Sequence, residues 1–475
     1  MTRILSILFL ALLVSSSYGQ TEPSTQPSNL NFSGIKSYRV STSFSSSGAD
    51  GHLVVISKNP ISFSPTDNVE YLKGQRIGDI KIGSVGGGTF TFFKNLLQDN
   101  TYYVAVYAFN QQGSNINYKS DAPLEGSITT SGTNYGNYYD GINFSSSNVV
   151  NDLTTLIQNH SQITYGQFDE NIIADFFETD TVVAGSTQKY VTCQYSNEKR
   201  LYSGTFSFTT PTPRYSREHR LPFSWINFQG IARADFEDTD EGCDVHALDL
   251  VQNDVNSARS NEPFGEVQNA WSNSYLDFKI GTDLNSLLVA EPKENIKGDV
   301  ARALFYMMLT YNGKYGQNWG LDNLLSAAED QDLQVLLDWH YNDLPDDFEK
   351  TRHEYVYEKQ SNRNPFVDFP QLVDCIDFSD VTKRANCDVN VGIASRIKNE
   401  FGTFIYPNPS YGVLYMENLR DRDIVGIHIF NLIGVEQHKY NVEADSINVE
   451  KLDKGIYILS IETKKQNYIS KFQLK

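Results

Sequence analysis

Apolar and polar residues alternate with a period of two from about residue 30 to residue 130. Alternation runs from Tyr38 to Phe44, and apolar runs follow at 52–56 and 89–93, separated by clusters of Ser, Gly, Asn and Pro. Short runs of this kind with regular turn signals are typical of strands in an antiparallel sandwich. The pattern predicts a β-sandwich between residues 30 and 131.

One stretch of this region, LQDNTYYVAVYAFN at 97–110, places a turn before a strong strand pattern. The residues expected on one face of that strand are Tyr102, Val104, Val106 and Ala108. The stretch resembles the tyrosine corner and following strand of fibronectin type III domains, with Tyr102 as the corner residue. The resemblance implies a binding or spacing module.

Beyond a short linker at 131–137 the apolar spacing changes to about 3.6 residues, the period of a helix. Apolar residues at this spacing predict helices over 150–160 and 298–311 and a third around Leu336. Acidic residues just after Pro345 have the composition of a further helix start. The middle of the chain is therefore expected to mix helices and strands, with helices carrying the core.

The pattern changes again over residues 402–475, where short strand-like runs are separated by turns. The segments that carry the pattern are YPNP at 406–409, IFNLIG at 429–434, LDKGIY at 452–457 and KFQLK at 471–475. In this order they resemble the C-terminal sorting domain of proteins exported by the type IX secretion system. The resemblance implies a small C-terminal β-sandwich, recognition by that secretion machinery, and release or anchoring at the cell surface.

The length of 475 residues predicts about three domains. Residues 1–19 have the composition of a signal peptide, with Arg3, an apolar run at 4–14 and small residues before Gln20. That run is too short to span a bilayer, and no later segment approaches the necessary length. We expect a secreted or cell-surface monomer without a membrane-spanning segment.

Four cysteines, Cys193, Cys243, Cys375 and Cys387, would suit an oxidising compartment. None has the close spacing of a zinc site, so up to two structural disulfides are expected. Spacing does not determine their connectivity. The short local pair Cys375–Cys387 is the preferred one.

The chain is acidic, with a net charge of −19 and a pI near 4.8. This balance counts against a generic basic nucleic-acid binder. A phosphate substrate would have to be held by a metal and a few placed arginines. The acidic run at 235–241 could bind calcium, but its spacing is not that of an EF-hand and a solvated loop is the preferred interpretation.

The candidate chemistry lies between residues 214 and 266. Two histidines each accompany a carboxylate, as Glu218-His219 and as Asp244-x-His246, and Asn256 follows. A carboxylate, a general base and a neutral oxygen ligand are the groups that metal-assisted attack on a phosphodiester requires. Because neighbours on a regular strand face opposite sides, Glu218 and His219 can share a pocket only near a strand end, and Pro222 is consistent with one.

Five segments in this part of the chain occur in a characteristic order. They are EHRLPFSW from 218, DVHAL from 244, VNSARSNEPFGEV from 255, KGDVARALFYM from 297 and QSNRNPFVDFPQLV from 360. Together, over about residues 138–376, they resemble the bacterial endonuclease I family. The resemblance implies a multidomain protein in which an α+β nuclease core of the ββα-metal type, residues 138–398, lies between the two β-sandwiches.

Carried onto this chain, the resemblance implies that His219 is the general base that deprotonates the attacking water. Glu218 and Asn256 would be protein ligands of one divalent metal, preferably Mg²⁺, with Ca²⁺ or Mn²⁺ as alternatives. The implied substrate is DNA, with RNA left open, and the products carry 5′-phosphate ends. Arg259, one turn from Asn256 on a helix, could reach a phosphate, and Arg233 is a weaker candidate.

Supporting residues have two interpretations. Asp244 and His246, expected on one face of a second strand, either orient the site or form a structural hydrogen-bonded pair. Arg363 and Asn364, before Pro365, suit a polar turn that braces the fold.

The chain departs from the family pattern at Ala247, at Asp249-Leu250 and at Phe369, where histidine or proline-containing pairs are frequent. These departures concern the surroundings of the proposed base and ligands, not the residues themselves. The competing function is a surface adhesin that carries a degenerate nuclease domain. A zinc peptidase is disfavoured because the chain has no HExxH segment.

Overall fold

The computed structural model describes most of the chain between residues 21 and 474. Residues outside the description are 1–20, 165, 167, 169–187, 204–205, 209–213, 272–274, 326–327, 329, 386–404, 407–409, 411, 417–423, 432–434, 441–445, 464–466 and 475. The expected signal peptide and Cys387 fall on these residues, and so does part of the sorting-domain pattern. The described chain divides into two compact units, residues 1–388 and 389–475.

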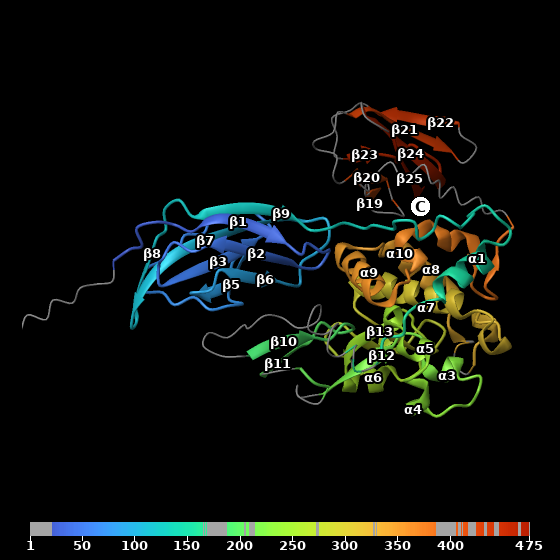
Figure 1. The fold of residues 1–475 in the computed structure, drawn as a ribbon. Coiled ribbons are helices and arrows are strands. Elements are labelled where there is room, and N and C mark those ends of the chain that lie inside the picture. Colours follow the sequence, from blue (N-terminus) through green and yellow to red (C-terminus); the bar gives the residue numbers. More distant parts are fainter. Residues whose placement is uncertain are drawn as a thin grey trace, which may run out of the picture. The chain divides into compact units, whose positions relative to one another are not determined.

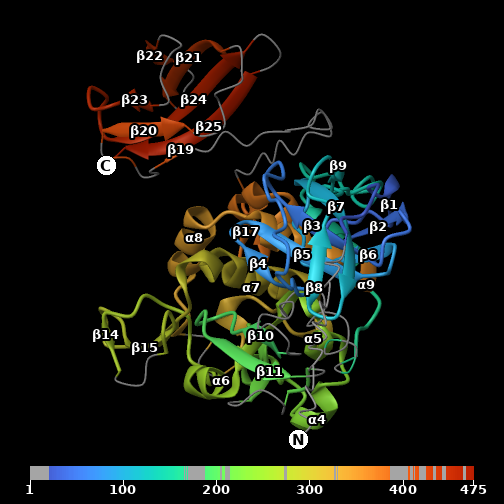
Figure 2. The same ribbon diagram turned by 90° about the vertical axis from the view of Figure 1, so that its left-hand side faces the viewer.

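The N-terminal region is an antiparallel β-sandwich, as predicted (Figure 1). One sheet has the order β1-β2-β6, formed by Ser28–Ser33, Val40–Ser45 and Phe90–Phe93. The other, whose strands are labelled in Figure 2, has the order β4-β5-β3-β7-β8, formed by Arg76–Ile77, Ile80–Gly86, Gly51–Ser57, Thr101–Gln112 and Asn115–Tyr118. Strand β9 (Leu124–Thr129) also pairs with β7.

Strand β7 shows why the alternation predicted this sandwich. Its residues Tyr102, Val104 and Val106 pack into the cluster that includes Val40 and Phe93 on the opposite sheet. The tyrosine corner is confirmed, because the hydroxyl of Tyr102 accepts a hydrogen bond of 2.8 Å from the backbone N–H of Leu97.

The middle region is mixed, and its long helices agree with the predicted periods. They are α1 (Val149–Ile157), α7 (Lys297–Tyr311), α8 (Leu333–Asn342) and α9 (Asp347–Gln360). Helix α7 is buried at every position, so it is the central helix of this region and not a one-sided amphipathic one. Asp346 caps α9 by accepting a hydrogen bond of 2.8 Å from the N–H of Glu349.

Two strands and a helix from the stretch 214–266 lie side by side (Figure 1). Strand β12 (Tyr215–His219) pairs antiparallel with β13 (Leu248–Gln252), and helix α6 (Asn253–Arg259) follows β13 directly. The connection between the strands carries α3 (Phe223–Ile226), α4 (Arg233–Phe236), α5 (Asp240–Cys243) and the 3₁₀ turn η2 (Val245–Ala247).

The remaining elements among the described residues of this region are short. They are the strands β10 (Gln188–Thr192), β11 (Lys199–Ser203), β14 (Asn269–Ala270), β15 (Lys279–Thr282), β16 (Leu288–Glu291), β17 (Ile376–Asp377) and β18 (Thr382–Lys383), the helix α10 (Pro365–Asp368), and the 3₁₀ turns η3 (Glu294–Ile296), η4 (Lys314–Gly316), η5 (Leu321–Asn323) and η7 (Pro370–Cys375). No helix in the described ranges is long and apolar enough to cross a membrane.

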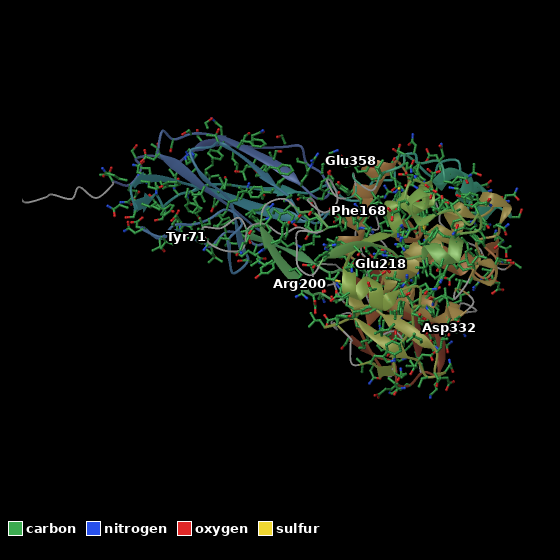
Figure 3. The ribbon with its side chains drawn as sticks, turned by 90° about the horizontal axis from the view of Figure 1, so that it is seen from below. Tyr71, Phe168, Arg200, Glu218, Asp332 and Glu358 are labelled. Atoms are coloured by element: carbon green, nitrogen blue, oxygen red, sulfur yellow. The ribbon has the colours of Figure 1, made fainter. Side chains whose placement is uncertain are left out.

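The sandwich contacts helix α9 within the first unit. The backbone N–H of Gln98 donates a buried hydrogen bond of 2.8 Å to the hydroxyl of Thr351. Lys36 lies 3.3 Å from the carboxylate of Glu358, which Figure 3 labels. The sandwich is therefore joined to the helical region by specific contacts as well as by the linker.

The C-terminal unit is a second, smaller β-sandwich with sheets of the order β19-β20-β23 and β22-β21-β24-β25. Its strands are Ile405–Tyr406, Val413–Met416, Ser446–Asn448, Glu436–Tyr440, Ile424–Asn431, Gly455–Thr463 and Asn467–Leu474, in that order. Its core includes Leu414, Ile429 and Leu459, all fully buried.

The cysteines follow the sequence prediction in part. Cys375 is disulfide-bonded, whereas Cys193 and Cys243 are buried free thiols, so a second disulfide between them is not formed. The pairing Cys375–Cys387 stays a prediction, because Cys387 lies outside the described residues.

Candidate active site at the end of strand β12

Strand β12 ends at the pair that the sequence singled out. Glu218 pairs with Asp249 of β13, and His219, the last residue of the strand, pairs with Leu248. Helix α6 starts at the far end of β13 and packs against both strands, so its last turn reaches Glu218. The strand end that the Glu-His pair requires is therefore present.

Glu218, labelled in Figure 3, is 3% exposed, and its carboxylate contacts Arg259 of α6. Its Oε1 atom is 3.4 Å from Nη1 of Arg259 and accepts a hydrogen bond of 3.4 Å from the hydroxyl of Tyr195. Burial raises the pKa of Glu218 to about 7, although Arg259 opposes the shift. The protein alone thus leaves the negative charge of this carboxylate incompletely compensated.

Asn256 lies one turn before Arg259 on α6, and residues three apart share a helix face. Its side chain is half-exposed, and among the described residues none forms a hydrogen bond with its amide. Glu218 and Asn256 are hard oxygen donors, which suit Mg²⁺ and similar ions and leave further positions for water and substrate. This donor set, which includes the undercompensated carboxylate of Glu218, fits one divalent cation.

His219 is 8% exposed, and its Nε2 atom lies 2.8 Å from the carbonyl oxygen of Gly242. A carbonyl only accepts hydrogen bonds, so Nε2 carries the proton and Nδ1 carries the lone pair. Burial lowers the pKa of His219 to about 4, which keeps the ring neutral at pH 7. The ring is therefore held in a tautomer that can accept a proton at Nδ1.

The segment that supplies this carbonyl is itself fixed. Glu241, 2% exposed, accepts hydrogen bonds from the ammonium group of Lys314 and the hydroxyl of Tyr315. Gly242 packs so closely that an added Cβ would lie 2.0 Å from the carbonyl oxygen of Phe236. The interpretation of 235–241 as a solvated loop is wrong for Glu241, because this carboxylate is buried in α5 against Lys314 and Tyr315.

The two candidate phosphate-binding arginines differ in exposure. Arg259 is 1% exposed, and its Nη2 donates a hydrogen bond of 2.9 Å to the carbonyl of Arg220. Arg233 has 62% of its side chain exposed, and its charge lowers the pKa values of both Glu218 and His219. Arg259 thus braces the strand end, whereas Arg233 presents a charge to the site from solvent.

Asp244 and His246 do not lie on the second strand, contrary to expectation. Asp244 caps the turn η2, which contains His246, and β13 begins only at Leu248. The carboxylate of Asp244 accepts hydrogen bonds of 2.7 Å from Tyr306 and 2.8 Å from Tyr311, both on α7. Among the described residues no hydrogen bond connects this pair to Glu218 or His219, and the contacts are those of a structural pair.

Arg363 and Asn364 also hold the fold together. The guanidinium of Arg363 is fully buried and binds the carboxylates of Asp368 and Glu354. Asn364 caps α10 by accepting a hydrogen bond of 2.9 Å from the N–H of Phe366.

The departures from the family pattern have partners of their own. Asp249 lies 2.5 Å from Nε of Arg220 in a buried ion pair. Phe369 packs against Tyr139 and Phe144, with ring centroids 5.0 and 5.3 Å away. Sequence reasoning missed Tyr195, Glu241 and Gly242, since each acts through a contact distant in the chain.

An antiparallel strand pair that runs directly into a helix, with a carboxylate and an imidazole at the strand end, defines the ββα architecture. Residues 145–371 match the family model described as Endonuclease I. An extracellular ribonuclease of Bacillus amyloliquefaciens is 32% identical over 227 residues, which cover 47% of this chain and 71% of the relative. The chain belongs to the Endonuclease I family.

A second relative, an extracellular ribonuclease of Bacillus subtilis (strain 168), is 38% identical over 138 residues, which are 28% of this chain. The chain spans about half, 46%, of that relative's length. Residues 404–475 match the model of the secretion system C-terminal sorting domain, which marks the protein for export. A human fibronectin type III domain is 18% identical, covering 22% of this chain and 73% of that domain, with a TM-score of 0.16.

Proposed function

We propose that this chain is a secreted, metal-dependent endonuclease that hydrolyses phosphodiester bonds of DNA and RNA with little sequence preference. The observation that carries the proposal is the strand end at which buried Glu218 faces α6 while His219 holds a fixed neutral tautomer. The Bacillus relatives are named extracellular ribonucleases, which supports RNA as one substrate.

In the proposed reaction, Nδ1 of His219 takes the proton from the attacking water. The hydrogen bond from Nε2–H to Gly242 holds the ring in place and stabilises the imidazolium once it has formed. An incoming phosphate brings negative charge near the ring, which favours the protonated form. His219 therefore becomes a better base when the substrate is present.

Glu218 and Asn256 would hold one divalent cation, most simply Mg²⁺. When bound, the cation supplies charge stabilisation at the phosphate and at the leaving 3′-oxygen, so the products keep a 5′-phosphate. Arg259 fixes the carboxylate of Glu218 and adds a positive charge beside the phosphate, and Arg233 would contact the phosphate from the exposed side. The surrounding acidity makes binding of the polyanion depend steeply on the cation.

Plasmid degradation with Mg²⁺ or with EDTA tests the proposal on the wild type, on His219→Ala and on His219→Gln. We expect cleavage with Mg²⁺ only, and a loss of about 10²–10⁴-fold in both variants, because neither side chain can accept the proton. Free imidazole should restore part of the activity of His219→Ala, because removal of the side chain leaves room for the ring in an otherwise intact fold. Full activity in His219→Ala would overturn the assignment of the base.

A wild-type protein that cleaves neither DNA nor RNA with Mg²⁺, Mn²⁺ or Ca²⁺ would favour the competing function, a surface adhesin. Digestion of only DNA or only RNA would restrict the substrate class to that polymer and would not change the roles proposed for the base and the metal ligands.

A further inference from the structure

The outer face of the three-stranded sheet in the N-terminal sandwich carries two exposed aromatic rings. On strand β6, Phe90 is 61% exposed and Phe92 is 39% exposed, whereas Thr91 and Phe93 between and after them are buried in the sandwich. Exposed phenylalanines side by side are uncommon on a soluble surface and mark an interaction site more often than a lone apolar residue does.

The strand register extends these rings into two rows. Phe92 pairs with Ser41, which pairs with Ser33 on β1. The second row runs Phe90, Ser43 and Asn31. We call these six residues the outer platform. Strands about 4.8 Å apart and alternate residues about 7 Å apart make it roughly 10 by 7 Å, a size that accommodates one or two stacked bases.

The charge around the outer platform differs from that of the rest of the chain. None of its six residues is acidic, and residues 21–131 hold equal numbers of acidic and basic side chains in a chain of net charge −19. The guanidinium carbon of Arg39 lies 5.6 Å from the ring centroid of Phe92. Within the described ranges no carboxylate forms an ion pair with Arg39, so its charge is available to an anion.

We propose that the outer platform binds single-stranded nucleic acid, with bases stacked on Phe90 and Phe92 and a phosphate held by Arg39. Stacking on aromatic side chains is tolerant of sequence, and serine hydroxyls and the Asn31 amide can meet the varied edges of exposed bases. The proposal rests on the proposed nuclease function, for which it supplies a place that holds the substrate outside the catalytic site.

Charge complementarity favours a polyanion over other occupants. A neutral polysaccharide would leave the positive charge of Arg39 uncompensated, and a second copy of the sandwich could bring Arg39 against another arginine. The chain as a whole carries a net charge of −19, so a face without acidic residues, beside an arginine that has no carboxylate partner among the described residues, is where a strand can bind.

The outer platform lies in the same compact unit as the proposed active site. Tyr38, next to Arg39, contacts Tyr355 of helix α9 with ring centroids 4.8 Å apart. A strand held on the outer platform therefore raises the effective concentration of its remaining phosphodiesters near the nuclease region. Long substrates gain from this effect, and dinucleotides, too short to engage both places, do not.

Binding of a fluorescein-labelled oligothymidylate to the full chain in EDTA, followed by fluorescence anisotropy, tests the proposal without cleavage. The variants are Phe90→Ser with Phe92→Ser, and Arg39→Gln. Matched controls on the other sheet are Val85→Ser and Arg76→Gln, both exposed in the wild type. We expect binding about tenfold weaker or more without the two rings, a salt dependence lower by about 0.7 in slope for Arg39→Gln, and controls like the wild type.

Cleavage assays separate this proposal from the proposed function. His219→Ala should bind the oligonucleotide as the wild type does while losing cleavage, and the double phenylalanine variant should raise KM for long substrates without changing kcat. Unchanged oligonucleotide binding in the double variant, with circular dichroism showing an intact fold, would overturn the platform and leave the nuclease proposal standing. If the double variant instead lost binding to an insoluble polysaccharide, the surface would be assigned to glycans, and the proposal that it binds nucleic acid would equally be overturned.

Discussion

Two carboxylate–histidine pairs that look alike in the sequence, Glu218–His219 and Asp244–His246, have opposite surroundings in the structure. The carboxylate of Asp244 accepts hydrogen bonds of 2.7–2.9 Å from Tyr306, Tyr311 and Gln360. The backbone N–H of His246 donates another hydrogen bond of 3.0 Å to the same carboxylate. The nearest partners of the Glu218 carboxylate, from Arg259 and Tyr195, lie at 3.4 Å.

The pKa values of the two carboxylates shift in opposite directions for this reason. Burial raises the pKa of Glu218 to about 7, and its few partners do not offset it. Burial would also raise the pKa of Asp244, but the charges of His160 and His246 and the hydrogen bonds from Gln360 and Tyr306 outweigh it, so the pKa is lowered. A saturated carboxylate supports the fold, and an undersaturated one retains capacity for a ligand.

Neutralising each carboxylate should therefore have opposite effects. Glu218→Gln removes a buried charge that the fold stabilises poorly, so we expect a thermal stability equal to or above that of the wild type. The metal-dependent activity should be lower by about 10–100-fold, because a ligand of the cation is lost. Asp244→Asn should cost about 1.5–3 kcal/mol of unfolding free energy, with cleavage per folded molecule retained. Urea unfolding and plasmid cleavage measure both, and a destabilised Glu218→Gln would contradict the comparison.

The contact of Glu241 with Lys314 and Tyr315 sharpens the comparison, because here a saturated carboxylate positions the catalytic region. Glu241→Gln weakens the ion pair that holds α5, and a displaced Gly242 carbonyl misorients His219. We expect kcat about tenfold lower or more, since misplacement by 1 Å can cost about 10²-fold. The metal concentration for half-maximal activity should not change.

The control for this variant is Asp235→Asn, an exposed carboxylate of the same acidic run. Equal losses in the two variants would mean that net charge, and not the contact with Lys314, sets the rate.

A buried histidine remote from the strand end should set part of the acid sensitivity. Burial lowers the pKa of His340 to about 3, and its Nε2 bonds the carbonyl of Pro370. Between the unfolded pKa of about 6.5 and the folded value, the unfolded state binds one more proton, so stability falls as pH falls.

His340→Gln keeps a donor for Pro370 and removes that proton uptake. The slope of unfolding free energy against pH should decrease by about 1.4 kcal/mol per pH unit in this window. Denaturant unfolding between about pH 4 and pH 6, which lies between the folded and the unfolded pKa of His340, measures the slope. The exposed His438→Gln serves as the control, and an unchanged slope in His340→Gln would contradict the assignment.

The smallest effect is expected at the exposed arginine. Arg233→Gln removes one phosphate contact from solvent, so KM should rise a few-fold and the salt dependence of KM should decrease by about one unit of slope, with kcat unchanged. The opposite pattern, a loss of kcat alone, would give Arg233 a part in the chemical step.

Local hydrophobic patterns and ordered motifs in the sequence predicted much of the fold. The period-two alternation predicted the sandwich, and the turn before Tyr102 predicted its corner. The helical period predicted α1 and α7, although it did not show that α7 is buried on all sides. The second strand was placed four residues too early, because Asp244-x-His246 alternates like a strand while Asp244 caps a turn.

What the sequence determined by itself is the set of local elements, since these depend on residue type and short spacing, and the proposal of Glu218, His219 and Asn256 as ligands and base stays a prediction. The tertiary structure alone decided which carboxylate–histidine pair keeps spare capacity. Asp244 is saturated by tyrosines more than sixty residues away, and Gly242 fixes the tautomer of His219 across twenty-three residues. Hydrogen-bond partners at such separations are set by packing, and packing leaves no periodic trace in the chain.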